Sequence, residues 1–173
     1  MRGRGLIILA MFLTATVVFA DDNPTACANA VKSAKVTPMQ AVEIALKAAG
    51  EGAVAYEMQV EIDTGVPVYE VRICKMGRRH TVDVGCENGE VVKQSDRSEV
   101  RFGLYKWDRM TITLAKAMEV ALEKVPGQVI DVDLVDTMGT PKFEVDIYTD
   151  GAVKEVEVNS NTGQVTKIED DDD

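Results

Sequence analysis

The 173-residue chain has one histidine, one tryptophan and three cysteines, and aromatic residues make up only 5% of it. It lacks four motifs of common catalytic or metal sites: G-x-x-x-x-G-K-[ST], G-x-G-x-x-G, H-E-x-x-H and C-x-x-C. A Ser-His-Asp triad would have to use His80, the single histidine, and no nucleophile-elbow sequence accompanies it. The sequence therefore argues against an enzyme, and it predicts no cofactor.

Basic residues are fewer than acidic ones, 19 against 29, so the formal net charge is −10 at pH 7. An acidic chain is repelled by phosphate backbones, so nucleic acid is not an expected partner. The acids are spread over both halves, apart from a terminal run from Glu169 to Asp173. We expect this run to be a solvated tail, with a cation site as the alternative.

The first twenty residues differ from the rest of the chain. Arg2 and Arg4 make the start positive, and an uncharged apolar run of fourteen residues follows from Leu6 to Phe19. This pattern predicts a secretory signal peptide that is cleaved after Ala20, and hence a secreted or periplasmic protein. The run is shorter than the roughly 20 residues of a membrane span, so an uncleaved anchor is the weaker alternative. After cleavage we expect no membrane span.

The remaining sequence repeats itself. YEVRICKMGRRHTVDVGCENGEVVK, from Tyr69, aligns without a gap with FEVDIYTDGAVKEVEVNSNTGQVTK, from Phe143, over 25 residues at an offset of 74. Upstream, QAVEIAL at 40–46 matches KAMEVAL at 116–122 at an offset of 76. We therefore expect two copies of a unit of about sixty residues, near the lower size at which a domain folds alone.

Each copy has the pattern of one helix followed by strands. Thr37 is a natural N-cap, Pro38 suits the first helical turn, and Gln40 completes a capping box; Thr113 is the cap of the second copy. Apolar and polar residues then alternate in strands predicted at 54–62, 68–75, 80–85, 90–94, 129–136, 142–149, 152–159 and 164–168. The predicted fold class is α+β: two tandem units, each one helix packed on an antiparallel sheet of three to four strands, with the other face solvated.

The expected domain organisation follows from these elements. It comprises the signal peptide at 1–20, an N-terminal segment at 21–35, a first unit at 36–95, an aromatic linker at 96–109, a second unit at 110–169 and an acidic tail at 170–173. The linker contains Phe102, Leu104, Tyr105 and Trp107 in place of the glycine and serine of a flexible linker. We expect these aromatics to pack between the units, with a partner surface as the alternative.

Cys74, His80 and Cys86 have the spacing C-x5-H-x5-C, which invites comparison with a metal or redox site. The second copy has Asp-Gly at its turn, so the first copy is predicted to turn at Met76-Gly77. That register places His80 opposite Ile73, and Cys86 roughly 23 Å from Cys74 at about 3.3 Å per residue. The distance excludes a disulfide or a shared metal ion, and we predict no metal site here.

An odd number of cysteines allows at most one internal disulfide. Cys27 precedes the first predicted helix by enough residues to reach either of the other two. Cys86 is the slightly preferred partner, because it lies near the base of the predicted sheet. Buried free cysteines are an equally good interpretation.

The first predicted hairpin is basic, whereas the matching tip of the second copy is TDGAVK. A solvated turn is the simplest interpretation, since exposed charges contribute little. The functional alternative is a docking patch for an acidic partner. A histidine can also act as a pH sensor, although Lys154 takes its place in the second copy. The candidate patch consists of Arg72, Lys75, Arg78, Arg79 and His80.

The pattern T-P-M-Q-A-V-E-I-A-L, V-Y-E-V-R-I, a glycine turn, V-D-V and E-N-G-E-V-V-K resembles the PepSY domain. The second copy is the closer match, with A-M-E-V-A-L, F-E-V-D-I, T-D-G and V-E-V-N-S-N-T-G-Q-V. The resemblance implies a non-catalytic, extracytoplasmic domain with a helix packed on an antiparallel sheet. It also implies a link to thermolysin-type metallopeptidases, whose propeptides contain this domain and restrain the protease. It assigns no functional residue.

The predicted function is therefore a non-catalytic extracytoplasmic module that binds and modulates, or inhibits, a protease or another envelope protein. The polar sheet face, an edge strand or the basic hairpin would make the contact. The alternative is a periplasmic protein that binds a small ligand or a metal ion, in a cleft between the units or at the acidic tail. A monomer and a homodimer both fit this interpretation.

Overall fold

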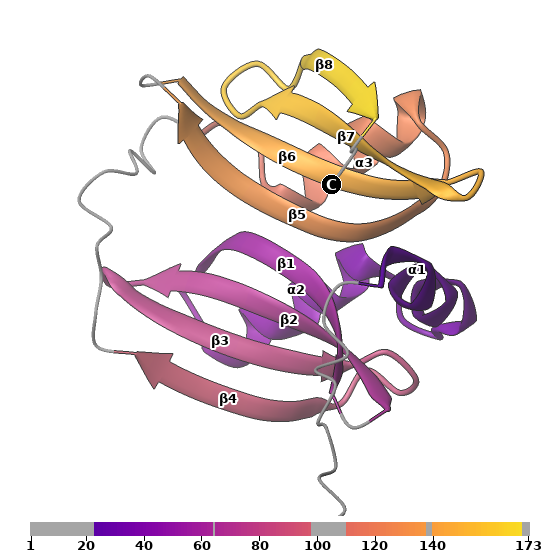
Figure 1. Ribbon diagram of the computed structural model, residues 1–173. Coiled ribbons are helices and arrows are strands. Elements are labelled where there is room, and N and C mark those ends of the chain that lie inside the picture. Colours follow the sequence, from indigo (N-terminus) through magenta and orange to yellow (C-terminus); the bar gives the residue numbers. More distant parts are fainter. Residues whose placement is uncertain (1–22, 64, 98–109, 138–139, 171–173) are drawn as a thin grey trace, which may run out of the picture.

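The computed structural model describes residues 23–63, 65–97, 110–137 and 140–170 (Figure 1). These residues form three helices and one antiparallel sheet of eight strands. The predicted signal peptide, the three aromatic residues of the linker with Leu104, and the last three residues of the tail lie outside the described part. Within the ranges that are described, no helix is long and apolar enough to cross a membrane.

Two of the three helices are those that the sequence predicts. They are α2 (Pro38–Ala49) and α3 (Leu114–Lys124). The capping box of α2 is present: the Gln40 N–H donates to Thr37 Oγ1 at 3.3 Å, and the Thr37 N–H donates to Gln40 Oε1 at 2.9 Å. Both helices lie on the same side of the sheet, behind it in Figure 1.

The third helix, α1 (Pro24–Ser33), falls in the N-terminal segment, for which no structure was predicted. Its N-cap is Asn23, whose Oδ1 accepts a hydrogen bond from the Ala26 N–H at 3.2 Å. Proline follows directly at the first helical position, where its missing N–H costs nothing. The pair Asn23-Pro24 could therefore have been used to predict the start of this helix from the sequence.

All eight predicted strands are present, but they form one sheet and not two. In chain order they are β1 (Val54–Asp63), β2 (Val66–Lys75), β3 (Arg78–Gly85), β4 (Val91–Arg97), β5 (Gln128–Thr137), β6 (Thr140–Thr149), β7 (Ala152–Asn159) and β8 (Val165–Asp170). Their spatial order is β4-β3-β2-β1-β5-β6-β7-β8. The expected separate sheets of three to four strands were wrong, because the edge strands β1 and β5 pair and satisfy each other's exposed backbone groups.

Three residue pairs make the seam between β1 and β5: Glu57 with Asp133, Met58 with Val132, and Gln59 with Asp131. Adding the repeat offset of 74 to Met58 gives Val132, so this residue faces its own counterpart in the other copy. The same offset relates Glu57 to Asp131 and Gln59 to Asp133, so the outer pairs exchange under the same operation. This is the reciprocal pattern of a two-fold interface, here formed within one chain.

Helix α1 packs against β1, β5 and β6, next to the point where the seam ends. Ala28 is buried with Ile130 and Val153 in a small cluster separate from the main core. Cys27, next to Ala28, packs against the same cluster, and its thiol donates a hydrogen bond to the carbonyl oxygen of Val60 at 3.5 Å. Val60 and Ile130 directly adjoin the paired residues. The N-terminal helix therefore contacts both copies beside their junction.

The main core is continuous across the two copies. Met58 and Val132, at the seam, are both 0% exposed, as are Tyr69 and Phe143 at equivalent positions of β2 and β6. The apolar residues of the strands lie under α2 and α3, and the polar residues lie on the other face. The predicted division into an apolar and a polar sheet face is confirmed by this alternation, but the polar face is not solvated throughout, since Glu57 and Asp83 on it are buried.

The hairpin formed by β2 and β3 has the predicted register. Ile73 pairs with His80, and the Cys86 N–H donates to the carbonyl oxygen of Pro67 at 3.2 Å. Met76 (φ 51°) and Gly77 (φ 72°) both have positive φ, as a type I′ turn requires.

Truncation of a seam residue should destabilise both copies together. We expect Met58→Ala to lower the free energy of unfolding by about 2 to 5 kcal/mol, because it opens a cavity where the two copies meet. Met76→Ala is the matched control, since Met76 is 93% exposed, and it should change the free energy by less than about 0.5 kcal/mol. Urea denaturation followed by circular dichroism measures both. Equal effects of the two substitutions would contradict the role of the seam.

Candidate functional site: the carboxylate face

The polar face of the sheet carries two rows of side chains that cross all eight strands. Each row is a series of directly paired residues, so neighbours in a row are about 4.8 Å apart between strands. The first row is Lys93, Asp83, Glu70, Gln59, Asp131, Asp146, Glu155 and Glu169. The second row is Ser95, Thr81, Arg72, Glu57, Asp133, Glu144, Glu157 and Lys167.

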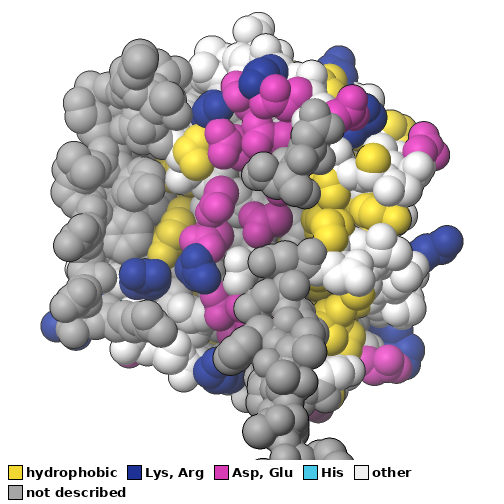
Figure 2. Space-filling model, viewed as in Figure 1, with side chains coloured by type: hydrophobic (Ala, Val, Ile, Leu, Met, Phe, Trp, Pro, Cys, Tyr) yellow, Lys and Arg dark blue, Asp and Glu magenta, His cyan; other side chains and the backbone are white. Residues whose placement is uncertain are grey.

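These sixteen residues form what we call the carboxylate face. It holds ten carboxylates and three cations. Figure 2 shows this side of the molecule, with Asp and Glu side chains gathered near its middle and Lys and Arg side chains beside them. The two rows are exchanged by the operation that relates the two copies, because each residue of one has its 74-residue counterpart in the other.

The carboxylates nearest the seam have strongly raised pKa values. Burial is the largest cause of the rise in the pKa of Glu57 to about 7, and the neighbouring charge of Asp133 adds to it. Burial also raises the pKa of Asp131 to about 8, with further contributions from Asp133 and Asp146. The pKa of Asp133 is raised for the same principal reason. Carboxyls in this position resist ionisation because they lose water and gain no sufficient positive charge.

One arginine pairs with two carboxylates in the half of the face that belongs to the first copy. Arg72 lies on β2 between two carboxylates, and its Nε donates to Glu70 Oε1 at 2.9 Å. One of its terminal nitrogens pairs with Glu57, which is only 8% exposed. A half-buried guanidinium with two carboxylates makes strong, charge-assisted hydrogen bonds. Arg72 therefore serves this face and does not extend from the hairpin tip.

The corresponding half of the second copy has a different charge pattern. The counterparts of Glu57 and Glu70 are Asp131 and Glu144, but the counterpart of Arg72 is Asp146. A third acid thus replaces the cation at the centre of the triad. Arg72, from across the seam, is a positive charge that lowers the pKa of Asp131, but its effect is smaller than those of burial and the neighbouring acids.

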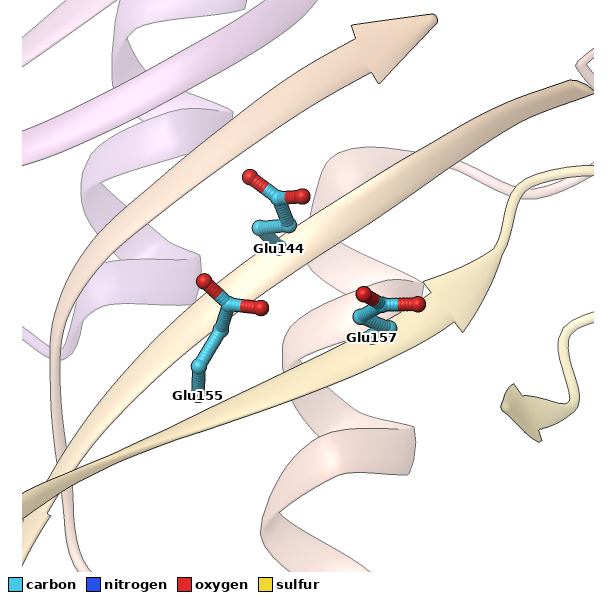
Figure 3. Close-up of side chains that lie close together, drawn as sticks. All are labelled: Glu144, Glu155 and Glu157. Carbon is cyan, nitrogen blue, oxygen red and sulfur yellow. The ribbon is translucent and has the colours of Figure 1, made fainter. Parts of the chain in front are cut away.

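Three glutamates lie close together further along the second copy. Glu144 on β6 and Glu155 and Glu157 on β7 have carboxylate oxygens within 4.8 Å of one another, and Figure 3 shows the three side chains projecting from neighbouring strands. Lys142 already supplies an ammonium group here: its Nζ lies 2.8 Å from Glu144 and 2.5 Å from Glu157. The lysine therefore takes the role that a metal ion would have in such a cluster.

The first copy has a further buried acid on this face, at Asp83 on β3. Its side chain is 92% removed from solvent, and Oδ2 lies 3.4 Å from Lys93 Nζ. The other carboxylate oxygen, Oδ1, is buried and has no hydrogen-bond partner among the described residues. A buried acceptor without a donor is costly, because folding removes its water and returns nothing.

The residues of the predicted basic patch are not brought together at one surface. Lys75 Nζ donates to the carbonyl oxygen of Ala49 at 2.5 Å, at the end of α2. His80 Nδ1 lies 2.6 Å from Asp96 Oδ1, and Arg79 is half-buried. Arg78 is exposed at the hairpin. With Arg72 committed to the carboxylate face, the patch stays a prediction with less accessible charge than the sequence indicated.

The cysteines lie as the predicted register requires, with Cys74 and Cys86 at opposite ends of the first hairpin. Burial is the largest cause of the rise in the pKa of the Cys86 thiol to about 11, and the nearby Cys27 contributes to the rise. Within the described chain no sulfur–sulfur bond is formed among the three cysteines. Cys27 and Cys86 lie near each other, because the charge of one affects the pKa of the other. A disulfide between them stays a prediction.

The polar sheet face was predicted as one candidate contact surface, but its residues and its concentration of carboxylates were not. Its signal was present in the alternating acids of the second copy, such as Asp131 and Asp133 or Glu155 and Glu157, which had to share one sheet face. The positions of the hairpin turns fix which strand residues pair within each copy, and this pairing places the acids side by side. The missing information was the pairing of β1 with β5, which joins the two half-faces.

The raised pKa values predict an unusual dependence of stability on pH. Glu57 and Asp131 bind protons more tightly in the folded state than at their ordinary pKa values of 4.5 and 3.8. The free energy of unfolding should therefore fall as the pH rises from about 5 to about 8. Asp131→Asn should flatten this slope, whereas Asp150→Asn, at an exposed turn, should not. Urea midpoints across this range measure the effect, and a midpoint that rises with pH would contradict it.

Comparison with known proteins places this fold in a family. The family model of the PepSY domain, described as the peptidase propeptide and YPEB domain, matches residues 35–95 and 111–169. The uncharacterized protein YkoJ of Bacillus subtilis (strain 168) is 28% identical over 155 residues, which cover 89% of this chain and 86% of that protein.

Two solved structures also align with the chain. A candidate lipoprotein from Clostridium difficile 630 has a TM-score of 0.49 and 20% identity, and the alignment covers 80% of this chain and 95% of that one. The YpmB protein from Bacillus subtilis has a TM-score of 0.36 and 16% identity, with 76% and 96% covered. The family model matches both copies and together these matches span most of the sequence, so the chain belongs to the PepSY family and carries the domain in tandem.

Proposed function

We propose that this tandem PepSY chain is a non-catalytic binding module that works outside the cytoplasm and holds a protein partner on its carboxylate face. The observation that carries the proposal is the pair of acidic rows on the side of the sheet opposite α2 and α3. Helix α1 reaches this side at one end, beside Tyr148 and Val153.

The energetics of the face support a binding role. Packing the carboxylates of Glu57, Asp131 and Asp133 around one arginine makes each harder to ionise, so the arrangement works against stability at neutral pH. Proteins commonly keep such destabilising arrangements where function uses them. A partner with a positively charged surface would relieve the repulsion between these carboxylates. It would also bind this face in preference to other surfaces of the molecule.

The dimensions of the face favour a macromolecular partner. Eight strands at about 4.8 Å spacing make each row roughly 34 Å long. A standard protein interface covers about 800 Å² on each partner, which suits a surface of this length. A small molecule would instead be held in a concave, mostly apolar pocket.

A peptidase is the class of partner that the family description suggests, since the domain is named for peptidase propeptides. The predicted signal peptide is consistent with an extracytoplasmic setting. The chain already contains both halves of its pseudo-symmetric sheet, so a monomer provides the complete face. In this proposal the module restrains or modulates its partner without chemistry of its own.

Capture of the partner on defined variants tests this proposal. Purified chain lacking residues 1–20 is used as bait for the envelope and secreted fractions, with a double variant of the face, Asp131→Asn with Asp133→Asn, and one of the hairpin, Arg78→Glu with Arg79→Glu. We expect a protein that the original chain and the hairpin variant retain and the face variant loses. Its peptidase activity is then measured with and without the module.

Other outcomes of the capture experiment would count against the proposal. A partner lost only by the hairpin variant would place the docking site at the basic patch. A partner retained equally by all three proteins would show that neither surface is used. Retention of no protein from either fraction would remove the support for a protein-binding role.

A small-ligand role is the second candidate, and one observation favours it. A groove of about 420 Å³ lies between α2 and the start of α3, lined mainly by apolar residues such as Val42, Leu46 and Ile112. This groove is the nearest counterpart of the cleft that the sequence suggested between the units. It lies on the helical side of the sheet, away from the carboxylate face.

A metal ion in the glutamate cluster is the other form of the second candidate. We expect calorimetry with calcium, zinc or copper ions to show no saturable micromolar binding, because Lys142 already bridges Glu144 and Glu157. Glu155→Gln is the comparison variant, since it removes one ligand of the cluster and leaves the lysine contacts intact. Micromolar binding to the original chain that is lost in Glu155→Gln would establish a metal site instead.

A further inference from the structure

We propose that the first row of the carboxylate face binds an extended basic segment of the partner, with one cationic side chain at Asp131 and a second, four residues away, at Asp83. The inference rests on the proposed function and specifies its chemistry. It follows from the pseudo-symmetry of the face, from an unsatisfied buried oxygen, and from the spacing of the strands.

The pseudo-symmetry identifies the first contact. In the first copy, Arg72 contacts Glu57 and Glu70. In the second copy, the counterparts of these two glutamates are Asp131 and Glu144. The counterpart of the arginine is an acid, Asp146. In that half Glu144 already pairs with Lys142 Nζ at 2.8 Å, whereas Asp131 has no ion pair among the described residues. A guanidinium from a partner would restore the arrangement that the first copy makes internally.

Asp83 identifies the second contact independently. It lies in the same row as Asp131, and the residue is 5% exposed. Lys93 approaches Oδ2 at 3.4 Å, while Oδ1 has no hydrogen-bond donor. The ammonium of Lys93 is itself largely exposed, so a partner's cation that takes its place would satisfy both oxygens and release the lysine to solvent. A bidentate guanidinium suits two carboxylate oxygens.

The spacing of the row fixes the pattern of the ligand. Asp131 and Asp83 are separated by Gln59 and Glu70, which makes three strand intervals or about 14 Å. An extended peptide advances about 3.4 Å per residue, so four residues span this distance. Residues i and i+4 of an extended chain also point to the same side. The expected motif is therefore two arginines or lysines separated by three residues, in an extended conformation.

Charge and chemistry favour this occupant over the alternatives. The first row contains six carboxylates and one lysine, so it attracts cations and repels acidic segments. Gln59, between the two anchors, donates from Nε2 to Glu61 Oε1 at 2.6 Å, and the second N–H of its amide can donate to a peptide carbonyl oxygen, a group that a bare metal ion does not offer. A polyamine shares the charge but not the directional hydrogen bonds of a peptide, and the peptide control below distinguishes the two.

Titration of the isotope-labelled chain with two peptides tests the inference. The first is Arg-Thr-Ser-Thr-Arg, and the second is the same composition in the order Arg-Thr-Ser-Arg-Thr. We expect saturable chemical-shift changes at the amides of Asp83 and Asp131 with the first peptide, and at least several-fold weaker binding of the second, whose arginines point to opposite sides. Equal affinity for the two peptides would overturn the proposed spacing.

Variants then locate the contacts. Asp131→Asn and Asp83→Asn should each weaken the first peptide by about tenfold, the value of one charge-assisted hydrogen bond. Glu123→Gln changes the charge equally on the exposed surface of α3 and should leave affinity unchanged. Should an asparagine variant fail to fold, Asp146→Arg gives an independent test, because it places an arginine where the first copy has Arg72 and should block the second-copy subsite. Affinity that is the same for all variants would overturn the proposal.

Two further outcomes separate this inference from the proposed function. Peptide binding with the expected variant pattern, together with failure to capture a partner, would support the chemistry of the row and count against a stable envelope partner. Capture of a partner on the carboxylate face without any binding of the peptides would support the proposed function and overturn the basic-segment inference. Calcium ions alone that shift the same amides at micromolar concentration would also overturn it, in favour of a metal site.

Discussion

The pairing of β1 with β5 is the constraint on which the rest of the structure depends. Met58 meets its own counterpart Val132 at this seam, and the two copies become one sheet with one core. The seam consists of three residue pairs, and α1 contacts both strands beside it. Without the pairing, each copy would expose a strand edge and would have only half of the carboxylate face.

The same seam explains why the chemistry of the face is uneven. A two-fold arrangement of identical copies would present the same charges on both sides. Here the copies differ in charge at several positions of the two rows, most centrally where Gln59 and Arg72 of the first correspond to Asp133 and Asp146 of the second. Arg72 pairs with Glu57 and Glu70 in the first half, and Lys142 pairs with Glu144 and Glu157 in the second. Divergence between the repeats has thus made the surface uneven, and it leaves Asp131, whose pKa is raised to about 8, beside other acids at the seam.

Local features of the fold were predictable from the sequence, and long-range pairing was not. The Thr37 capping box and the turn at Met76-Gly77 depend on neighbours in the chain, so the helix start and the hairpin register were right. The seam depends on two edges 74 residues apart, which no local pattern specifies, and the predicted separate sheets were wrong. Arg72 was assigned to the basic hairpin for the same reason, because its carboxylate partners become visible only when the sheet is assembled.

The most direct test of the account is the titration of Asp131 itself. The carbon-13 shift of its carboxyl group, followed against pH, should show a midpoint near pH 8 in the chain alone, as burial and surrounding acids require. Addition of the Arg-Thr-Ser-Thr-Arg peptide should move the midpoint down, because a bound guanidinium stabilises the ionised form. A midpoint near pH 4 in the chain alone, or one that the peptide leaves unchanged, would contradict the claim that this face binds a partner's cation at Asp131.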